Sequence, residues 1–208
     1  MLDVYLINHM IMKRIIVLFF ALFTISAASA QTFIGLVKDA ATEVVDKVTG
    51  GKVTEIMLNG TWEYDSPAVR FVKDGDILAS AASTLVTEGL ESRLTKAYSY
   101  IGIKEDAASF TFNDDDTFTA VLGKRTLNGT YTYDSATHQL ELEFASILKL
   151  GKLNGYAYID GEELDLVFDC TKFTNFLTKL GSKSSLLKGV TAITDKYDTM
   201  MVGFEFER

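Results

Sequence analysis

Apolar and polar residues alternate along most of the second half of the chain. Such a period of two is typical of strands that bury one face, and six of these segments follow one another with short turns between them. The alternation predicts strands over 108–112, 117–122, 126–133, 138–144, 154–159, 164–168 and 200–207, and an earlier strand is predicted over 53–64. Strands of this kind, joined mostly by tight turns, favour an antiparallel meander.

Three other segments place apolar residues at helical spacing. Residues 33–48 form a predicted amphipathic helix that ends at Gly50-Gly51. A helical insertion is predicted over about 67–103, with Ser66 as its cap and Pro67 in its first turn. The third segment, 171–197, is broken at Gly181-Ser182 and precedes the last strand.

A repeated motif organises the strands. Leu-Asn-Gly followed by alternating aromatic residues occurs at 58–66 and 127–135, and a looser copy occupies 153–160. We interpret each Asn-Gly as a tight turn that sets the register of the strand after it. The aromatic residues of each copy then share one face.

These patterns predict a mainly β protein, an eight-stranded antiparallel up-and-down barrel, with a two-sheet sandwich as the main rival. The predicted barrel carries the N-terminal helix, the insertion between strands 1 and 2, and a helix before the last strand. Its inward rows would collect these aromatic residues: Trp62, Tyr64, Phe110, Phe112, Phe118, Tyr131, Tyr133, Phe144, Tyr156, Tyr158, Phe168, Phe204 and Phe206. Inward tyrosine hydroxyls need partners, which points to a cavity or to the barrel ends.

The first thirty residues have the features of a signal peptide. Lys13-Arg14 precede an apolar run over 15–25, and Ala28-Ser29-Ala30 fits the cleavage rule. The run is shorter than the roughly 20 residues of a membrane span. We therefore expect residues 1–30 to be removed, with Met12 as an alternative start, and 31–208 to form one exported domain in the periplasm or outside the cell. After cleavage no membrane span is expected.

Charge and composition narrow the classes of function. The net charge of −8 becomes −9 when residues 1–30 leave, which argues against nucleic-acid or anionic-membrane partners. Cys170 is the only cysteine, so no intrachain disulfide forms, and a buried apolar role is the commoner case.

Residues for chemistry are scarce. His138 is the only histidine after the signal peptide, and no metal, cofactor or nucleophile set can be assembled. The acidic run 114–116 is interpreted as a hairpin loop, with a calcium site as the weaker alternative. The strand carboxylates alternate with apolar residues and face solvent in this interpretation, so an enzyme built on paired acids is not expected.

Gly60-Thr61-Trp62 at the start of a strand resembles the Gly-x-Trp signature of lipocalins and the wider calycin group. Residues 31–208 also resemble a lipocalin-like family of exported Bacteroidetes proteins, a domain of unknown function. The resemblance implies that Trp62 closes one end of the barrel and packs under the core. Lipocalins stack a basic residue from a late strand on this Trp; here only Arg208 lies on the last strand, and the partner is left open.

Two hypotheses follow for function. The first is an exported binding protein for a small apolar or amphipathic ligand held inside the barrel, with Tyr64, Tyr131, Tyr133, Tyr156 and Tyr158 as its lining. The insertion could then cover the barrel mouth. The alternative is a non-enzymatic structural or protein-interaction module of the cell envelope, with a filled barrel and a protein partner bound through helix 33–48.

Overall fold

The computed structural model describes residues 52–73, 76–77, 84–145, 150–194 and 200–208. The chain divides into two compact units, Met1–Gly35 and Leu36–Arg208, and every described residue belongs to the second. The predicted signal peptide and the predicted helix 33–48 lie outside the described residues.

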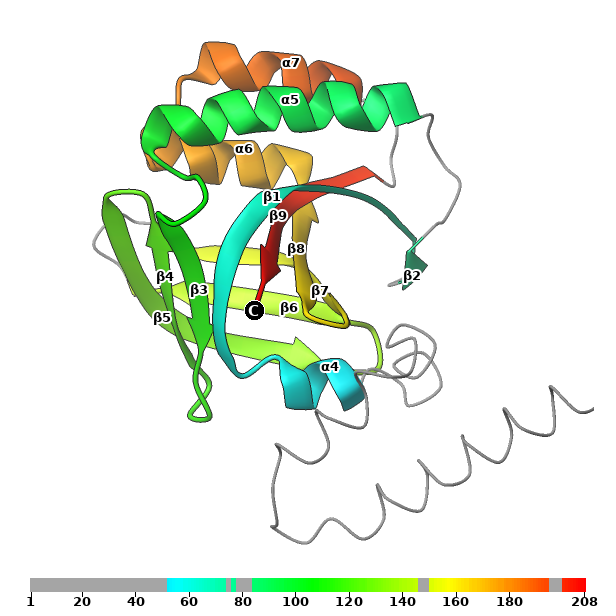
Figure 1. Ribbon diagram of the computed structural model, residues 1–208, viewed down its shortest axis with the longest axis vertical. Coiled ribbons are helices and arrows are strands. Elements are labelled where there is room, and N and C mark those ends of the chain that lie inside the picture. The colour runs from blue at the N-terminus through cyan, green and yellow to red at the C-terminus, as the bar shows by residue number, and fades with distance from the viewer. Residues whose placement is uncertain (1–51, 74–75, 78–83, 146–149, 195–199) are drawn as a thin grey trace, which may run out of the picture. The chain divides into compact units, whose positions relative to one another are not determined.

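Eight antiparallel strands close into an up-and-down barrel (Figure 1). Neighbours in sequence pair in turn, and the first and last strands, β1 and β9, pair to close the ring. The strands are β1 (Gly60–Lys73), β3 (Ala108–Phe112), β4 (Thr117–Leu122), β5 (Arg125–Asp134), β6 (Gln139–Phe144), β7 (Lys152–Asp160), β8 (Glu163–Asp169) and β9 (Met200–Glu207). A two-residue strand, β2 (Asp76–Ile77), pairs with the end of β1. The barrel prediction is confirmed and the sandwich alternative is wrong.

Helices lie at the two ends of the barrel in Figure 1. The short helix α4 (Lys52–Met57) precedes β1 at one end, and α5 (Thr84–Ile101), α6 (Cys170–Lys179) and α7 (Ser184–Thr194) gather at the other. Helix α5 buries one face, Leu90, Leu94 and Tyr98, toward the barrel. The helix between barrel strands 1 and 2 and the helix before the last strand were both predicted.

The first strand was misplaced in the sequence prediction. Residues 52–57 are helical, and β1 continues through Pro67 to Lys73 instead of giving way to a helix at Ser66. From Tyr64 to Phe71, β1 pairs with β9 but no longer with β3, so the other side of this part of the strand has no partner strand among the described residues. Proline, which lacks an N–H donor, is tolerated at such an edge, and the register shift between Tyr64 and Ser66 bends the strand there.

The Asn-Gly pairs are not turns. Gly129 and Gly155 lie inside β5 and β7, and Gly60 begins β1. A Cβ on Gly129 would overlap the Glu143 carbonyl oxygen and lie 2.7 Å from the Phe118 ring. A Cβ on Gly155 would likewise overlap a carbonyl oxygen of β8. These glycines therefore allow close approach between adjacent strands of the coiled barrel wall.

Candidate functional site

Aromatic rings pack against one another inside the barrel, where the ligand was expected. Neighbouring ring centroids lie 5.1 to 6.1 Å apart around a closed circuit that runs from the barrel wall through helix α6 and back. The members in order are Phe110, Phe118, Phe144, Phe176, Phe173, Phe204 and Phe206. Each ring is at most 6 % exposed. Helix α6 thus inserts two phenylalanines into the space that an open lipocalin-like barrel would leave for a ligand.

Tyr64 belongs to this core. Its ring makes edge contacts with Tyr98, Phe204 and Phe206 at about 6 Å. Burial, with a smaller contribution from Asp65, raises the pKa of Tyr64. Tyr98 closes the mouth from α5: its hydroxyl donates to the Gly203 carbonyl at 2.6 Å, and burial raises its pKa.

Trp62 lies at the other end, beside α4. Its indole is fully buried, and Nε1–H donates to the Leu58 carbonyl at 2.8 Å. The Arg208 guanidinium stacks 3.8 Å above the indole and donates to the carbonyls of Met57 and Asn59 at 2.5 and 2.6 Å. Arg208 is therefore the partner that the sequence left open, and a cation–π contact joins the two ends of the described chain.

Tyr131 stabilises a corner of the barrel. Its hydroxyl lies 2.9 Å from Asn59 Oδ1 and 3.2 Å from the Asn113 carbonyl, and the side chain is buried. Burial, followed by the nearby acidic loop, raises its pKa. In that loop the Asp115 carboxylate accepts hydrogen bonds from the Thr117 N–H and hydroxyl, which lower its pKa. The loop is a hairpin between β3 and β4.

Tyr156 and Tyr158 face outward, so their assignment to the inward row is wrong. On β7 the buried residues are Ala157 and Ile159, and the two tyrosines alternate with them. Their rings stack on the outer surface with centroids 6.2 Å apart. They cover an apolar cluster that includes Val167, and the Tyr158 ring also packs at a tilt against His138, with centroids 5.0 Å apart.

A groove on the outer barrel wall is lined in part by two of the five predicted tyrosines, Tyr156 on the outward face of β7 and Tyr133 on the inward face of β5. This strand groove has a volume of about 500 Å³ and is lined from β5, β6, β7, the start of α6 and β9. Its lining is Thr132, Tyr133, Asp134, Gln139, Leu140, Glu141, Asn154, Gly155, Tyr156, Asp169, Lys172 and Met201. Tyr133 is half-buried, with its hydroxyl 3.1 Å from His138 Nδ1. The groove offers ring faces beside amide, carboxylate and ammonium groups.

A charged cluster lies on the same outer wall, across β1, β8 and β9. Arg70 Nε and Nη2 donate to Asp165 at 2.5 Å and Glu205 at 3.0 Å, and Ser66 donates to Glu205 at 3.2 Å. Burial raises the pKa of Asp165 to about 7, opposed by Arg70 and reinforced by Glu205. Asp165 Oδ1 has no hydrogen-bond partner in the described part of the chain. Sequence reasoning missed this cluster, because it treated the strand carboxylates as a solvated face.

The described ranges contain neither a metal-binding cluster nor a membrane-spanning helix. Those residues contain no group of three or more His, Cys, Asp or Glu side chains placed to hold a metal ion. The same ranges hold no helix with both the length and the hydrophobicity needed to cross a membrane. Cys170 is buried at the start of α6.

An eight-stranded antiparallel barrel with a buried tryptophan stacked under arginine at one end is a lipocalin-like barrel. The chain belongs to the family described as "Lipocalin-like domain (DUF4923)", whose model matches residues 35–208. The comparison with curated proteins found no match. Among solved structures, a DUF4847 family protein from Bacteroides vulgatus is similar at 15 % identity and a TM-score of 0.39, over 74 % of this chain and 96 % of that one.

Proposed function

We propose that this protein is an exported, non-enzymatic lipocalin-like binding protein for a small amphipathic molecule, held in the strand groove and not inside the barrel. The observation that carries the proposal is the groove itself, since about 500 Å³ lies within the range of small-molecule sites. The aromatic rings packed inside the barrel support placing the ligand in the strand groove. A ligand in the interior would have to displace Phe173 or Phe176.

The lining chemistry sets the class of ligand. Tyr156 presents a half-buried ring on the outer wall, whereas Tyr133 lies on the inward face of β5 beside Leu140, with its hydroxyl near His138. Asn154 and Lys172 add donors around the rings. A ligand with an apolar body and several hydroxyl or amide groups fits both the aromatic and the polar residues of the lining. The aromatic surface excludes water from its apolar body, and the polar groups set its orientation.

Octyl glucoside below its micelle concentration is a suitable neutral probe, followed by amide chemical shifts. We expect saturable shifts at 132–134 and 154–156 and little change on the inward positions of β4. Tyr156→Ala should weaken binding about tenfold, which corresponds to the loss of roughly 1.4 kcal/mol from one aromatic contact. Tyr100→Ala is the matched control, since Tyr100 is 50 % exposed on α5, away from the groove. Saturable shifts inside the barrel, or none in the groove, would contradict the proposal.

Export rests on the leader features of residues 1–30. N-terminal sequencing of the mature protein from its own cells is expected to begin at Gln31. A cytoplasmic protein that retains residues 13–30 would refute this part alone, because the groove does not depend on it.

The filled interior also supports the second candidate, a protein-interaction module of the envelope. Its predicted contact element, helix 33–48, lies outside the described residues. Deletion of 33–48 should then abolish capture of a defined envelope partner while the groove still binds octyl glucoside. Partner capture without any binding in the groove would favour this alternative over the first.

A further inference from the structure

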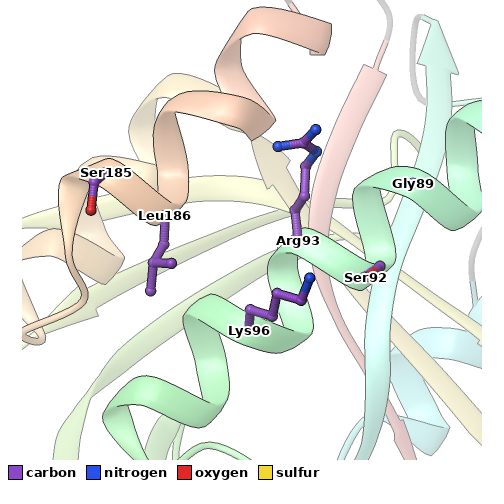
Figure 2. A pocket seen from close by; sticks show the side chains of 6 residues that line it. All are labelled: Gly89, Ser92, Arg93, Lys96, Ser185 and Leu186. Atoms are coloured by element: carbon purple, nitrogen blue, oxygen red, sulfur yellow. The ribbon is translucent and has the colours of Figure 1, made fainter.

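A second groove lies away from the barrel wall, between helices α5 and α7. Figure 2 shows this helix groove, with Arg93 and Lys96 projecting from α5 beside Ser185 and Leu186 of α7. Its volume is about 370 Å³, and Gly89 and Ser92 complete the lining. It shares no residue with the strand groove.

The helix groove is cationic in an acidic protein. The chain carries a net charge of −8, yet the described residues of the lining include one arginine, one lysine and two serines, and none of these described residues is a carboxylate. Within the described ranges, the ion pairs are formed by Arg70 and Lys152, and neither Arg93 nor Lys96 takes part in one. Two cations whose charge is not neutralised in the described part of the chain attract an anion to this place.

Gly189 of α7 sets the position of the arginine. A Cβ on Gly189 would overlap Nη1 of Arg93 and lie 3.1 Å from its Cζ, so the guanidinium rests directly against the α7 backbone. Arg93 therefore reaches across the groove from α5 to α7. The exposed guanidinium lies against α7 and can make paired hydrogen bonds to two oxygens of one anion, a geometry that arginine offers and lysine does not.

We propose that the helix groove binds a phosphate group, either as the free ion or as a monoester. Arg93 donates two hydrogen bonds to the phosphate, Lys96 supplies a second positive charge, and Ser92 and Ser185 donate from their hydroxyls. A phosphate accepts this many donors because it carries three or four oxygens, whereas a carboxylate carries two. The site is independent of the proposed ligand of the strand groove.

Titration with inorganic phosphate and with glycerol phosphate separates the two sources, each against sodium chloride at equal ionic strength. Binding is read from the Nε–Hε resonance of Arg93 and from calorimetry. We expect a saturable shift with phosphate and none with chloride, and tighter binding of glycerol phosphate if the monoester is the ligand. Arg93→Ala should weaken binding about tenfold or more, as loss of a charge-assisted pair does. A response equal to that of chloride would overturn the proposal.

Two glycine variants test the geometry without a change of charge. Gly189→Ala should displace the guanidinium and weaken phosphate binding, but by less than Arg93→Ala, because the exposed arginine side chain can shift and keep its charge. Gly89→Ala is the matched control, since a Cβ there meets nothing within 4 Å, and it should leave binding unchanged. Circular dichroism verifies that both variants fold. Unchanged phosphate binding by folded Arg93→Ala would show that Arg93 is not a ligand of the anion, and unchanged binding by folded Gly189→Ala would show that contact with α7 does not set its position.

Discussion

Asp165 makes the stability of this barrel depend on pH near neutrality. Its side chain is 11 % exposed and lies between Arg70 and the cross-strand carboxylate Glu205. Burial raises the pKa of Asp165 to about 7. In the unfolded chain the pKa of aspartate is about 3.9, so the folded state holds the proton more tightly.

The sign and size of the effect follow from this difference. A raised carboxyl pKa stabilises the fold fully below pH 3.9, and that stability is lost as pH rises toward 7. With 1.36 kcal/mol for each pKa unit, the free energy of unfolding is expected to fall by about 2.5 kcal/mol between pH 5 and pH 7.5.

Urea unfolding followed by the fluorescence of Trp62, the only tryptophan, measures this change. Asp165→Asn removes the titrating group. The difference in free energy of unfolding between wild type and variant should therefore change with pH as calculated for Asp165. Asp160→Asn, at the exposed end of β7, serves as the matched control and should keep the wild-type slope. Parallel stability curves for wild type and Asp165→Asn over this pH range would refute the reasoning.

Two further variants test how the ends and the wall of the barrel are held. Arg208→Ala loses the contact with Trp62 and two charged hydrogen bonds. We expect the free energy of unfolding in urea to fall by about 2–3 kcal/mol and the tryptophan emission to shift. An unchanged unfolding midpoint would contradict a stabilising role for Arg208. Gly129→Ala places a Cβ against the Glu143 carbonyl and should lower the free energy of unfolding by about 3 kcal/mol. Gly89→Ala, with open space around the added Cβ, should be neutral or slightly stabilising. Equal effects of the two variants would show that the strands can separate to make room for the methyl group.

The strands from β3 to β9 could be predicted from the sequence nearly to the residue, because each buries one face. Two errors had physical causes. Pro67 has the features of a helix start, but it is accommodated in β1 only because β3 has already ended, a fact of pairing that local sequence does not contain. The outward direction of Tyr156 could have been found: counted from the shared glycine, it lies one position earlier than Tyr131 does, and a shift of one residue reverses the face.

The candidate site was only partly accessible from the sequence. Tyr133 and Tyr156 were named, but the groove that joins them lies on the wall that the pattern assigned to solvent. The filled interior depends on helix α6, whose Phe173 and Phe176 were assigned to a helix face without a known target. Which helix enters a barrel is decided by tertiary packing, and periodicity alone is silent on that choice.

The seam between β1 and β9 has a kinetic consequence. It joins residues that are 139 apart at the Ser66–Glu205 hydrogen bond, whereas the other strand pairs from β3 to β9 are neighbours in sequence or nearly so. Contacts of such long range pay the largest loop-closure entropy and form late. A meander from β3 to β8 can therefore assemble first and remain an open sheet, with two unpaired edges exposed to aggregation, until β1 and β9 meet.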